Sequence, residues 1–452
     1  MRKDIPNFWK VLFALIACLL SNTSAVAQDR VYEIWEPYPA PNRGGTYEVT
    51  MARGVPFDTD WESWSYPIGN GYMGASIFGG LDTERVQITD KTLHNRGPYN
   101  RGGITSFVEL YLDFNHQDAT NYRRSINLNE GIAYVSYEID GVRYTREYFA
   151  NYPSNVLVVR LNASKKGALS FRAYKKSPHA DKPERRDERE DEIRSEGDLI
   201  RMHGSNPFFG INFESQLKVI PQGGTLEDSA AHPGALQVSG ADSAIMILAL
   251  GTNYELNPGV FLNSQYEKID PTHFPHEAVT QRLAEADQKG YEALREEHLA
   301  DFQNLFGRVQ VQLSPEVLDK PTHGVLGEYQ EMQTVANRST YIEELIFHYG
   351  RYLLISSSRE NTLPAALQGV WSQYDYTPWT GGYWHNINVQ MNYWGAMPVN
   401  LAETFTPYIE FYKAYLPAAE AAATEYIAKT HPDRVSSEEG GNGWIIGTGA
   451  NA

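Results

Sequence analysis

The carboxamide side chains of one short stretch are the groups best suited to chemistry in this sequence. Within residues 381–394, Asn386, Asn388 and Gln390 alternate with three apolar residues, so an extended backbone would point the carboxamides one way and the apolar groups the other. Carboxamides both donate and accept hydrogen bonds, so this face could bind sugar hydroxyls and hold a water molecule. The pattern favours a carbohydrate site. The alternative is a core strand with buried, hydrogen-bonded amides.

Aromatic side chains flank this stretch on both sides. They are Trp371, Trp379, Tyr383 and Trp384 before it and Tyr393 and Trp394 after it. Flat rings can stack on the apolar faces of sugar rings. We therefore predict an oligosaccharide or polysaccharide partner. The predicted substrate-binding residues are Trp371, Trp379, Trp384 and His385.

Length and charge limit the class of protein. A chain of 452 residues with 42% hydrophobic residues is long enough for two or three domains with sizeable cores. The 56 acidic and 39 basic residues give a net charge of -17, which argues against a nucleic-acid partner or an anionic membrane surface. A neutral, polar ligand is unaffected by this charge. The 29 Tyr and 9 Trp residues fit a sugar-binding protein better than a nucleotide-binding one.

The N-terminus has the three parts of a secretory signal. Basic residues precede the apolar run Val11–Leu20, and the small residues Ala25–Ala27 follow it, so we expect a signal peptide over residues 1–27 and a secreted or periplasmic protein. The apolar run is too short to span a bilayer, and no later stretch predicts a transmembrane segment. Lipid anchoring at Cys18 is the alternative. Cleavage after Ala27 would leave no cysteine.

Residues 31–270 predict a large antiparallel β-sandwich. Alternating runs at 133–139 and 142–148 are joined by Asp140-Gly141, which is the signature of a β-hairpin. Further strands are expected at 155–162, 169–174 and 244–250, which are rich in branched apolar residues. Residues 175–194 mix both charge signs with two prolines, and we expect them to form an exposed loop.

The pattern changes to helical spacing near Pro275. Residues 271–324 predict a helical linker, with a helix over 278–305 and a strand at 309–313 that returns to the sandwich. Residues 325–452 predict a second, all-helical domain. Its expected helices are a buried one over 343–356 and a packed pair, 399–415 and 418–429, divided by Pro417.

Four motifs, taken in order, resemble glycoside hydrolase family 95, which contains alpha-L-fucosidases and some alpha-L-galactosidases. They are Trp64–Gly80, Tyr144–Pro153, Leu363–Trp371 and Asn386–Trp394. The resemblance implies a super-β-sandwich, a helical linker and an (alpha/alpha)6 barrel, of which this chain would hold the first part. It also implies an inverting mechanism with a glutamic acid as general acid and an aspartate as general base. In that family two asparagines orient the attacking water, and the motif maps them onto Asn386 and Asn388.

The sequence departs from the family pattern at three places. Fucosidases of the family commonly have a histidine two places before the first asparagine, near the C5 substituent of the sugar, where this chain has Trp384. His94 stands where a tryptophan is usual. No carboxylate here sits in a motif for the acid or base, so we expect both beyond Ala452 and expect this chain alone to be inactive. Glu403, Glu410 and Glu425 are interpreted as solvated or structural.

Other chemistry finds no support in the sequence. His273 and His276 have no cysteine or carboxylate cluster around them, so we expect no metal site and no cofactor.

The hypothesis is a secreted exo-acting glycoside hydrolase that removes a terminal L-fucose or related L-sugar. The alternatives are a non-catalytic carbohydrate-binding protein, an inert fragment, or another inverting barrel enzyme such as a disaccharide phosphorylase.

Overall fold

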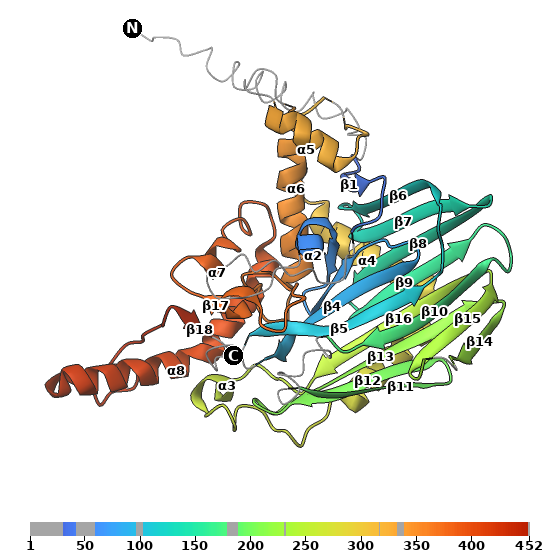
Figure 1. Ribbon diagram of the computed structural model, residues 1–452. Helices are drawn as coiled ribbons and strands as arrows, with labels where there is room; N and C mark the ends of the chain where they lie inside the picture. Colours follow the sequence, from blue (N-terminus) through green and yellow to red (C-terminus); the bar gives the residue numbers. More distant parts are fainter. Residues whose placement is uncertain are drawn as a thin grey trace, which may run out of the picture.

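The computed structural model describes residues 30–41, 59–95, 103–178, 189–229, 232–315, 317–331 and 339–450. The predicted signal peptide, residues 1–27, lies outside these ranges. The strands form one large layered body and most of the helices lie beside it, with α4 against the sheet (Figure 1). The change from β to helical structure falls close to the position that the sequence predicts.

The larger sheet has nine antiparallel strands. Its spatial order is β1 (Glu33–Glu36), β6 (Thr120–Asn127), β7 (Ile132–Ile139), β8 (Val142–Asn151), β9 (Val156–Ala163), β16 (Ser243–Thr252), β13 (Ile211–Gln222), β12 (Leu199–Asn206) and β11 (Glu190–Glu196). The predicted hairpin is β7–β8, in which Ile139 pairs with Val142. Its turn residues Asp140 and Gly141 have φ of 50° and 70°, the left-handed values that a two-residue hairpin turn requires.

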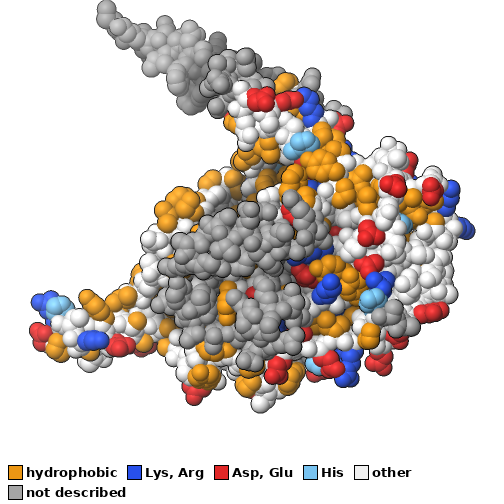
Figure 2. Space-filling view, in the orientation of Figure 1, with side chains coloured by type: hydrophobic (Ala, Val, Ile, Leu, Met, Phe, Trp, Pro, Cys, Tyr) orange, Lys and Arg blue, Asp and Glu red, His pale blue; other side chains and the backbone are white. Residues whose placement is uncertain are grey.

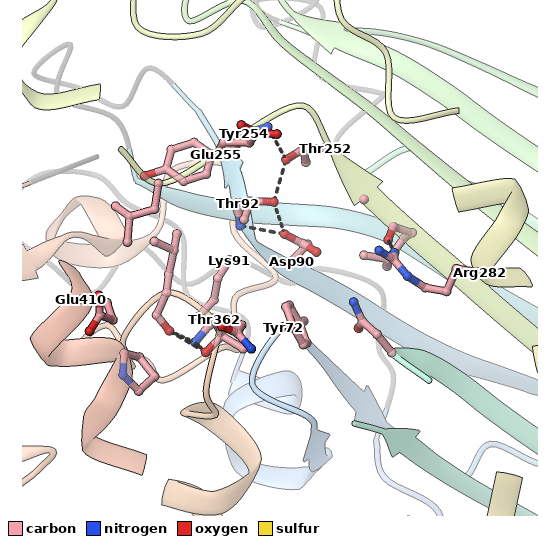
Figure 3. A pocket seen from close by; sticks show the side chains of 17 residues that line it. Tyr72, Asp90, Lys91, Thr92, Thr252, Tyr254, Glu255, Arg282, Thr362 and Glu410 are labelled. Carbon is pink, nitrogen blue, oxygen red and sulfur yellow. Dashed lines mark hydrogen bonds between the residues drawn. The ribbon is translucent and has the colours of Figure 1, made fainter. Parts of the chain in front are cut away.

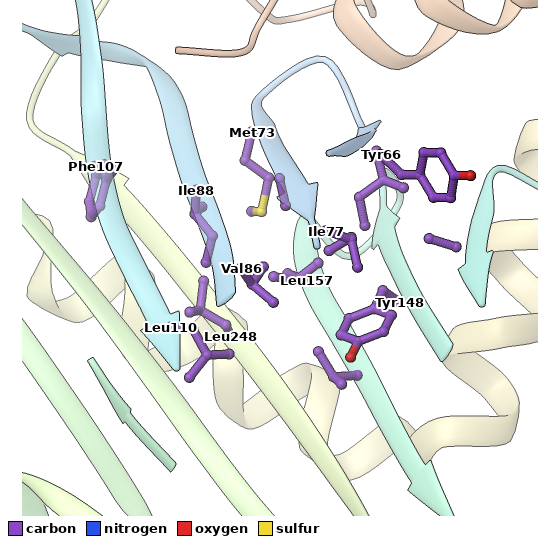
Figure 4. Close-up of a cluster of buried hydrophobic side chains, with 14 of the residues drawn as sticks. Tyr66, Met73, Ile77, Val86, Ile88, Phe107, Leu110, Tyr148, Leu157 and Leu248 are labelled. Atoms are coloured by element: carbon purple, nitrogen blue, oxygen red, sulfur yellow. The ribbon is translucent and has the colours of Figure 1, made fainter. Parts of the chain in front are cut away.

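The smaller sheet has seven strands and packs against the first. Its order is β14 (Thr225–Asp228), β15 (Ala235–Ala241), β10 (Leu169–Lys176), β5 (Ile104–Asp113), β4 (Thr83–His94), β3 (Met73–Ile77) and β2 (Tyr66–Gly69). The space between the sheets is filled by buried side chains from both, among them Ile77, Val86 and Leu110 from one sheet and Leu157 and Leu248 from the other (Figure 4). The predicted β-sandwich is thus present.

The prediction of an exposed loop at residues 175–194 is wrong at both ends of that range, where the structure has strands. Lys175 belongs to β10 and is buried, where its amine donates to Ile200 O at 2.8 Å and Ser215 O at 3.0 Å. Burial lowers the pKa of Lys175 well below its usual value. At the other end, Glu190–Glu196 forms β11 and pairs with β12. Charge density misled the prediction because backbone pairing at a sheet edge does not depend on side-chain polarity.

Helix α4 (His276–Phe306) covers the outer face of the nine-stranded sheet and confirms the helix predicted at 278–305. Val279, Leu283 and Leu294 pack against buried side chains of the sheet such as Phe149 and Ile247. The helix is interrupted at Gly290, which has φ of 74°. This packing joins the linker region firmly to the sandwich.

The strand predicted at residues 309–313 is absent from the structure. Its backbone bonds to side chains of α6 (Thr340–Ser357) instead of to a sheet. The N–H groups of Leu313 and Ser314 donate to Glu344 Oε2 at 2.8 and 2.9 Å, and His348 Nε2 lies 3.1 Å from Val311 O. Residues 309–313 do alternate as a strand would, but their backbone groups find their hydrogen-bond partners on α6 and not on a neighbouring strand.

The remaining elements of the described residues are short, apart from α8 (Thr406–Thr430). They include α2 (Thr59–Trp64), α3 (Gly259–Leu262), α5 (Thr322–Glu331), α7 (Asn388–Met391) and the two-stranded pair β17 (Tyr383–Trp384) and β18 (Gly449–Ala450), with single 3-10 turns at Pro378–Gly381, Ala402–Phe405 and Pro432–Arg434. The predicted helix pair divided by Pro417 is wrong, because α8 continues through Pro417. A proline removes one backbone donor, and the helix tolerates that loss here.

Helix α8 projects from the body and carries apolar and charged side chains together (Figures 1 and 2). Ile409, Leu416 and Tyr426 along it are exposed by 42%, 43% and 57%. Within the described ranges, no helix combines the length and apolar character needed to cross a membrane. In the same part of the chain, no three His, Cys, Asp or Glu side chains stand close enough to hold a metal ion.

Stability is expected to fall between pH 7 and pH 4 because of His298. This residue is buried on α4 beside Phe149, its Nε2–H donates to Glu130 O at 2.9 Å, and burial lowers the pKa of His298 to about 4. A folded-state pKa below the unfolded value of about 6.5 means that this contribution is complete above pH 6.5 and lost as the pH falls through 4. The free energy of unfolding should fall by up to about 3 kcal/mol over this pH range because of His298.

The measurement is the urea midpoint of unfolding at pH 7 and pH 5 for the parent, His298→Gln and His273→Gln. His273 is exposed and serves as the matched control. His298→Gln should flatten the pH dependence while His273→Gln leaves it unchanged. Equal slopes in all three proteins would contradict the assignment.

Candidate functional site

The segment that holds Asn386 and Asn388 is not the extended strand that the alternation predicts. Only Tyr383–Trp384 is extended, in β17, and Asn388–Met391 forms the single helical turn α7. Asn386 lies between them with φ of 81°, a left-handed conformation that asparagine tolerates better than most residues. The two-faced strand is therefore wrong, and Asn386 turns the chain from β17 into α7.

The two asparagines are nevertheless exposed, while their neighbours differ from the prediction. Asn386 and Asn388 are both classed as exposed, whereas Val389 is buried at 1% exposure. The other apolar members of the alternation, Ile387 and Met391, are 45% and 50% exposed. Of the three apolar residues that alternate with the carboxamides, only Val389 is therefore buried.

Two side chains just after the asparagines fix this segment to the preceding motif. Asn392 Nδ2 donates to Ala366 O at 2.8 Å and to Ala365 O at 3.2 Å. The buried hydroxyl of Tyr393 accepts from the Ala365 N–H at 2.7 Å and lies 2.7 Å from Ser358 Oγ. The third and fourth motifs of the sequence therefore form one bonded unit, and its exposed edge carries the asparagines.

Trp379, Trp384 and His385 lie next to this edge with different exposure. The Trp384 indole N–H donates to Trp379 O at 2.7 Å, and Trp379 is 58% exposed with φ of 55°. His385 is only 5% exposed, and its Nδ1 lies 3.1 Å from Gly447 O. The carbonyl of Gly447 can only accept, so His385 donates from Nδ1; burial lowers the pKa of His385. The structure brings Trp379 and Trp384 together at the surface and turns His385 inward; the substrate-binding roles stay predictions.

Trp371 occupies a different environment from the other predicted site residues. It is buried, and its indole N–H donates to Ile68 O in β2 at 2.8 Å. A Cβ atom on Gly74 would come within 2.7 Å of its ring, and one on Gly69 within 3.3 Å. The ring thus fills the space that two glycines of the sandwich leave open. This contact is structural, and binding of substrate by Trp371 remains a prediction.

Lys91 makes a second contact between the sandwich and the helical region, and the sequence did not predict it. Its buried amine donates to Ser357 O at 2.9 Å, to Thr362 Oγ1 at 3.1 Å and to Leu363 O. Burial lowers the pKa of Lys91 well below its usual value. A lysine inside the run Thr83–His94 of β4, where side chains are mostly buried, was the available signal.

The first and second motifs meet at the same place. Asn70 Nδ2 donates to Asn151 O at 2.9 Å, and the Tyr152 hydroxyl donates to Glu360 O at 3.0 Å. The Arg359 guanidinium lies 3.9 Å from the centre of the Tyr152 ring. All four motifs therefore converge where the sandwich meets the helical region, which we call the junction. Asn386 and Asn388 lie at an exposed edge of the junction.

The carboxylates that follow the motif are engaged elsewhere or solvated. Glu403 pairs with Arg308 at 2.5 Å, and Glu410 pairs with Lys413 at 2.7 Å. Glu425 is exposed on α8. These positions agree with the solvated or structural roles expected for them, and none of the three is paired with a second carboxylate in the described contacts.

Comparison with known proteins places the chain in context. Residues 290–452 match the glycosyl hydrolase family 95 catalytic domain, and residues 50–104 and 95–257 match the glycosyl hydrolase family 65 N-terminal domain. The chain is related to glycoside hydrolase family 95. The predicted resemblance is thereby confirmed, and so is the fold class: a β-sandwich followed by the start of an alpha/alpha-barrel domain.

The curated relatives carry the names of fucosidases. Alpha-L-fucosidase 2 of Arabidopsis thaliana is 28% identical, with 81% of this chain and 51% of the relative covered. Proteins named probable alpha-fucosidase A from Aspergillus niger and Aspergillus oryzae are 26% and 25% identical, covering 80% and 76% of this chain and 51% and 52% of their own length. The chain spans about half the length of the curated relatives it matches.

Among solved structures, the chain is similar to one described as a kojibiose phosphorylase from the human microbiome. The TM-score is 0.47 at 10% identity, with 86% of this chain and 52% of that chain covered. A similarity of this size supports no conclusion about function.

The junction predicts that a side chain at position 74 will destabilise the protein. Gly74→Val should lower the free energy of unfolding by about 1 to 3 kcal/mol, because the new Cβ overlaps the Trp371 ring. The matched control is Gly350→Ala in α6, where a Cβ meets nothing within 4 Å. Replacing a helical glycine in open space should stabilise by up to about 1 kcal/mol. Chemical unfolding followed by tryptophan fluorescence measures both, and equal effects of the two changes would contradict the role of the junction.

Proposed function

We propose that this chain is part of an inverting exo-glycoside hydrolase that releases a terminal L-fucose, or a related L-sugar, from glycans. The observation that carries the proposal is the exposed pair Asn386 and Asn388, which lies beside two surface tryptophans inside the family 95 catalytic-domain match. The names of the curated relatives support fucose as the sugar. Because the chain spans about half of those relatives, the activity belongs to the whole protein.

Inversion requires a water molecule on the face of the sugar opposite the leaving group. A general base takes a proton from this water while a general acid protonates the departing oxygen, and the two carboxyl groups stand about 6.5 to 9.5 Å apart. A carboxamide oxygen can accept a hydrogen bond from the water while its NH2 donates to the base. In the proposal Asn386 and Asn388 do this, and orientation of the water is their contribution to the rate.

The acid and base are not assigned to the carboxylates described above. Glu403 pairs with Arg308 and Glu410 pairs with Lys413, and neither is placed opposite a second carboxylate as an acid and base pair requires. The proposal therefore places the two proton-transfer groups beyond Ala452, in the part of the whole protein that corresponds to the unmatched half of the relatives.

Trp384 is proposed to contact the C5 substituent of the sugar, in place of the histidine common in the family. Its indole N–H already donates to Trp379 O, so the ring offers an apolar face to a ligand. An apolar face suits the methyl group of fucose better than the hydroxymethyl group of galactose, although a hydrophobic pocket rejects an added hydroxyl only about 100-fold.

A non-catalytic carbohydrate-binding role is the second candidate. The ion pairs of Glu403 and Glu410 favour it, because the described residues then supply binding groups without a proton-transfer pair. The two candidates differ in one measurable respect: a binding protein retains sugars without releasing any product.

The test is release of L-fucose by the whole protein, expressed with the coding sequence that follows residue 452. We expect hydrolysis of 2′-fucosyllactose and aryl α-L-fucosides, with the β-anomer of fucose appearing first in proton NMR spectra because one displacement inverts the anomeric carbon. Binding without release would favour the second candidate. Initial formation of the α-anomer would rule out inversion, and release that requires phosphate would indicate a phosphorylase.

The asparagine pair is tested in the same whole protein. Asn386→Ala combined with Asn388→Ala should lower kcat by about 100-fold or more with little change in KM, because orientation of the water matters only in the transition state. Asn304→Ala, an exposed asparagine on α4, is the matched control and should leave both constants unchanged. An unchanged kcat in the double variant would remove the water-orienting role.

A further inference from the structure

A separate cavity lies between the sandwich and the helical region. Its volume is about 490 Å³, within the usual range of small-molecule sites. It is bounded by β4 and β16 of the sandwich, by α4, and by residues 361–363 and the first turns of α8 (Figure 3). No residue of 381–394 is among its described lining, so it is distinct from the edge that carries Asn386 and Asn388.

A buried carboxylate forms part of its wall. Asp90 is 6% exposed, and its Oδ1 accepts from the N–H of Thr92 at 2.7 Å and from the hydroxyl of Thr92 at 2.5 Å. That hydroxyl lies 2.7 Å from Thr252 Oγ1, so the threonine pair holds the carboxylate in one orientation. Both bonds engage Oδ1 and leave Oδ2 without a donor among the described contacts. Burial raises the pKa of Asp90, which reflects the solvation that the carboxylate lacks.

A guanidinium and a phenol lie beside Asp90. Arg282 of α4 donates from one nitrogen to Leu250 O at 2.5 Å, and its remaining N–H groups have no other bond among the described residues. Its charge acts on both Asp90 and Tyr72, and it forms no ion pair with Asp90 among the described contacts. Tyr72 stacks one face on Tyr152, with ring centres 6.0 Å apart, and is half-buried at the cavity. Figure 3 shows Asp90, Tyr72 and Arg282 among the side chains that line the cavity.

The charges around the cavity select the class of ligand. Asp90, Glu255 and Glu410 all line it against the single guanidinium, because the amine of Lys91 is turned toward carbonyl groups of the helical region. An anion would meet the carboxylates of Asp90 and Glu255, which form no ion pair among the described contacts, and that of Glu410, which pairs with Lys413. A metal ion would lack ligands, since no three acidic or histidine groups converge in the described residues. A neutral polyol fits: its hydroxyls can donate to Asp90 and accept from Arg282, and its ring can lie against Tyr72.

We propose that this cavity is a second carbohydrate site, which takes one neutral sugar residue held by Asp90, Arg282 and Tyr72. It does not depend on hydrolysis and stands whether or not the whole protein cleaves glycosides. Its place at the junction suits a glycan that is bound by the sandwich while its end is presented to the helical region.

The test uses the whole protein and saturation-transfer NMR with lactose and with L-fucose at millimolar concentrations. Asp90→Asn keeps the size of the side chain and removes its charge, and Arg282→Gln shortens the donor. Each should weaken binding at this site about tenfold, because each removes a charge-assisted hydrogen bond. Glu296→Gln, an exposed change on the same helix away from the cavity lining, is the matched control and should leave binding unchanged.

Trp384→Ala separates the two sites, since it alters only the proposed hydrolytic site. The proposal requires a binding component that survives Trp384→Ala and is weakened about tenfold in both Asp90→Asn and Arg282→Gln, with thermal midpoints and near-ultraviolet spectra unchanged. It is overturned if neither sugar binds the parent, or if the folded variants bind as the parent does. Release of L-fucose is measured in parallel: its absence refutes the hydrolase and leaves the cavity result standing.

Discussion

The arrangement of the helical region depends on one contact, in which the Trp371 ring packs against the backbone of Gly69 and Gly74. Its indole N–H is bonded to Ile68 O, so the ring is fixed in direction as well as in depth. Tyr393 and Asn392 then bond the next motif to the segment that Trp371 anchors. The position of the exposed asparagines is therefore set by the sandwich, through two successive sets of buried contacts.

Lys91 reinforces the same junction by an electrostatic route. Its amine donates to Ser357 O, the carbonyl of the last residue of α6, where a helix leaves its final carbonyls unpaired and its dipole is negative. A strand of the sandwich thus completes the end of a helix in another layer. Desolvating an amine is costly, and three oxygen acceptors at one point are what make the burial of Lys91 tolerable.

The sequence predicted the elements whose signals are local. The turn Asp140-Gly141 requires left-handed backbone, and the spacing of Val279, Leu283 and Leu294 gives a helix a buried face; both were found as expected. The strand predicted at residues 309–313 was wrong because their hydrogen-bond partners, on α6, lie about thirty residues away in sequence. The strand predicted over residues 386–394 was wrong for another reason, because the stretch has both the alternating spacing of a strand and the spacing of a helix. Alternation suggested a strand, but Val389, Tyr393 and Ala396, which are all buried, have the i, i+4, i+7 spacing of a helix.

That helical period explains why Asn388 is exposed. Successive residues of a helix are rotated by about 100°, so burial of Val389 within the single turn α7 directs the preceding residue, Asn388, away from the core. Asn386 stands before the helix, where its left-handed backbone turns the chain outward. The two carboxamides are thus presented by the packing of their apolar neighbours. A site arranged in this way is held rigid by the core beneath it, and its polar groups remain free to bind water or a ligand.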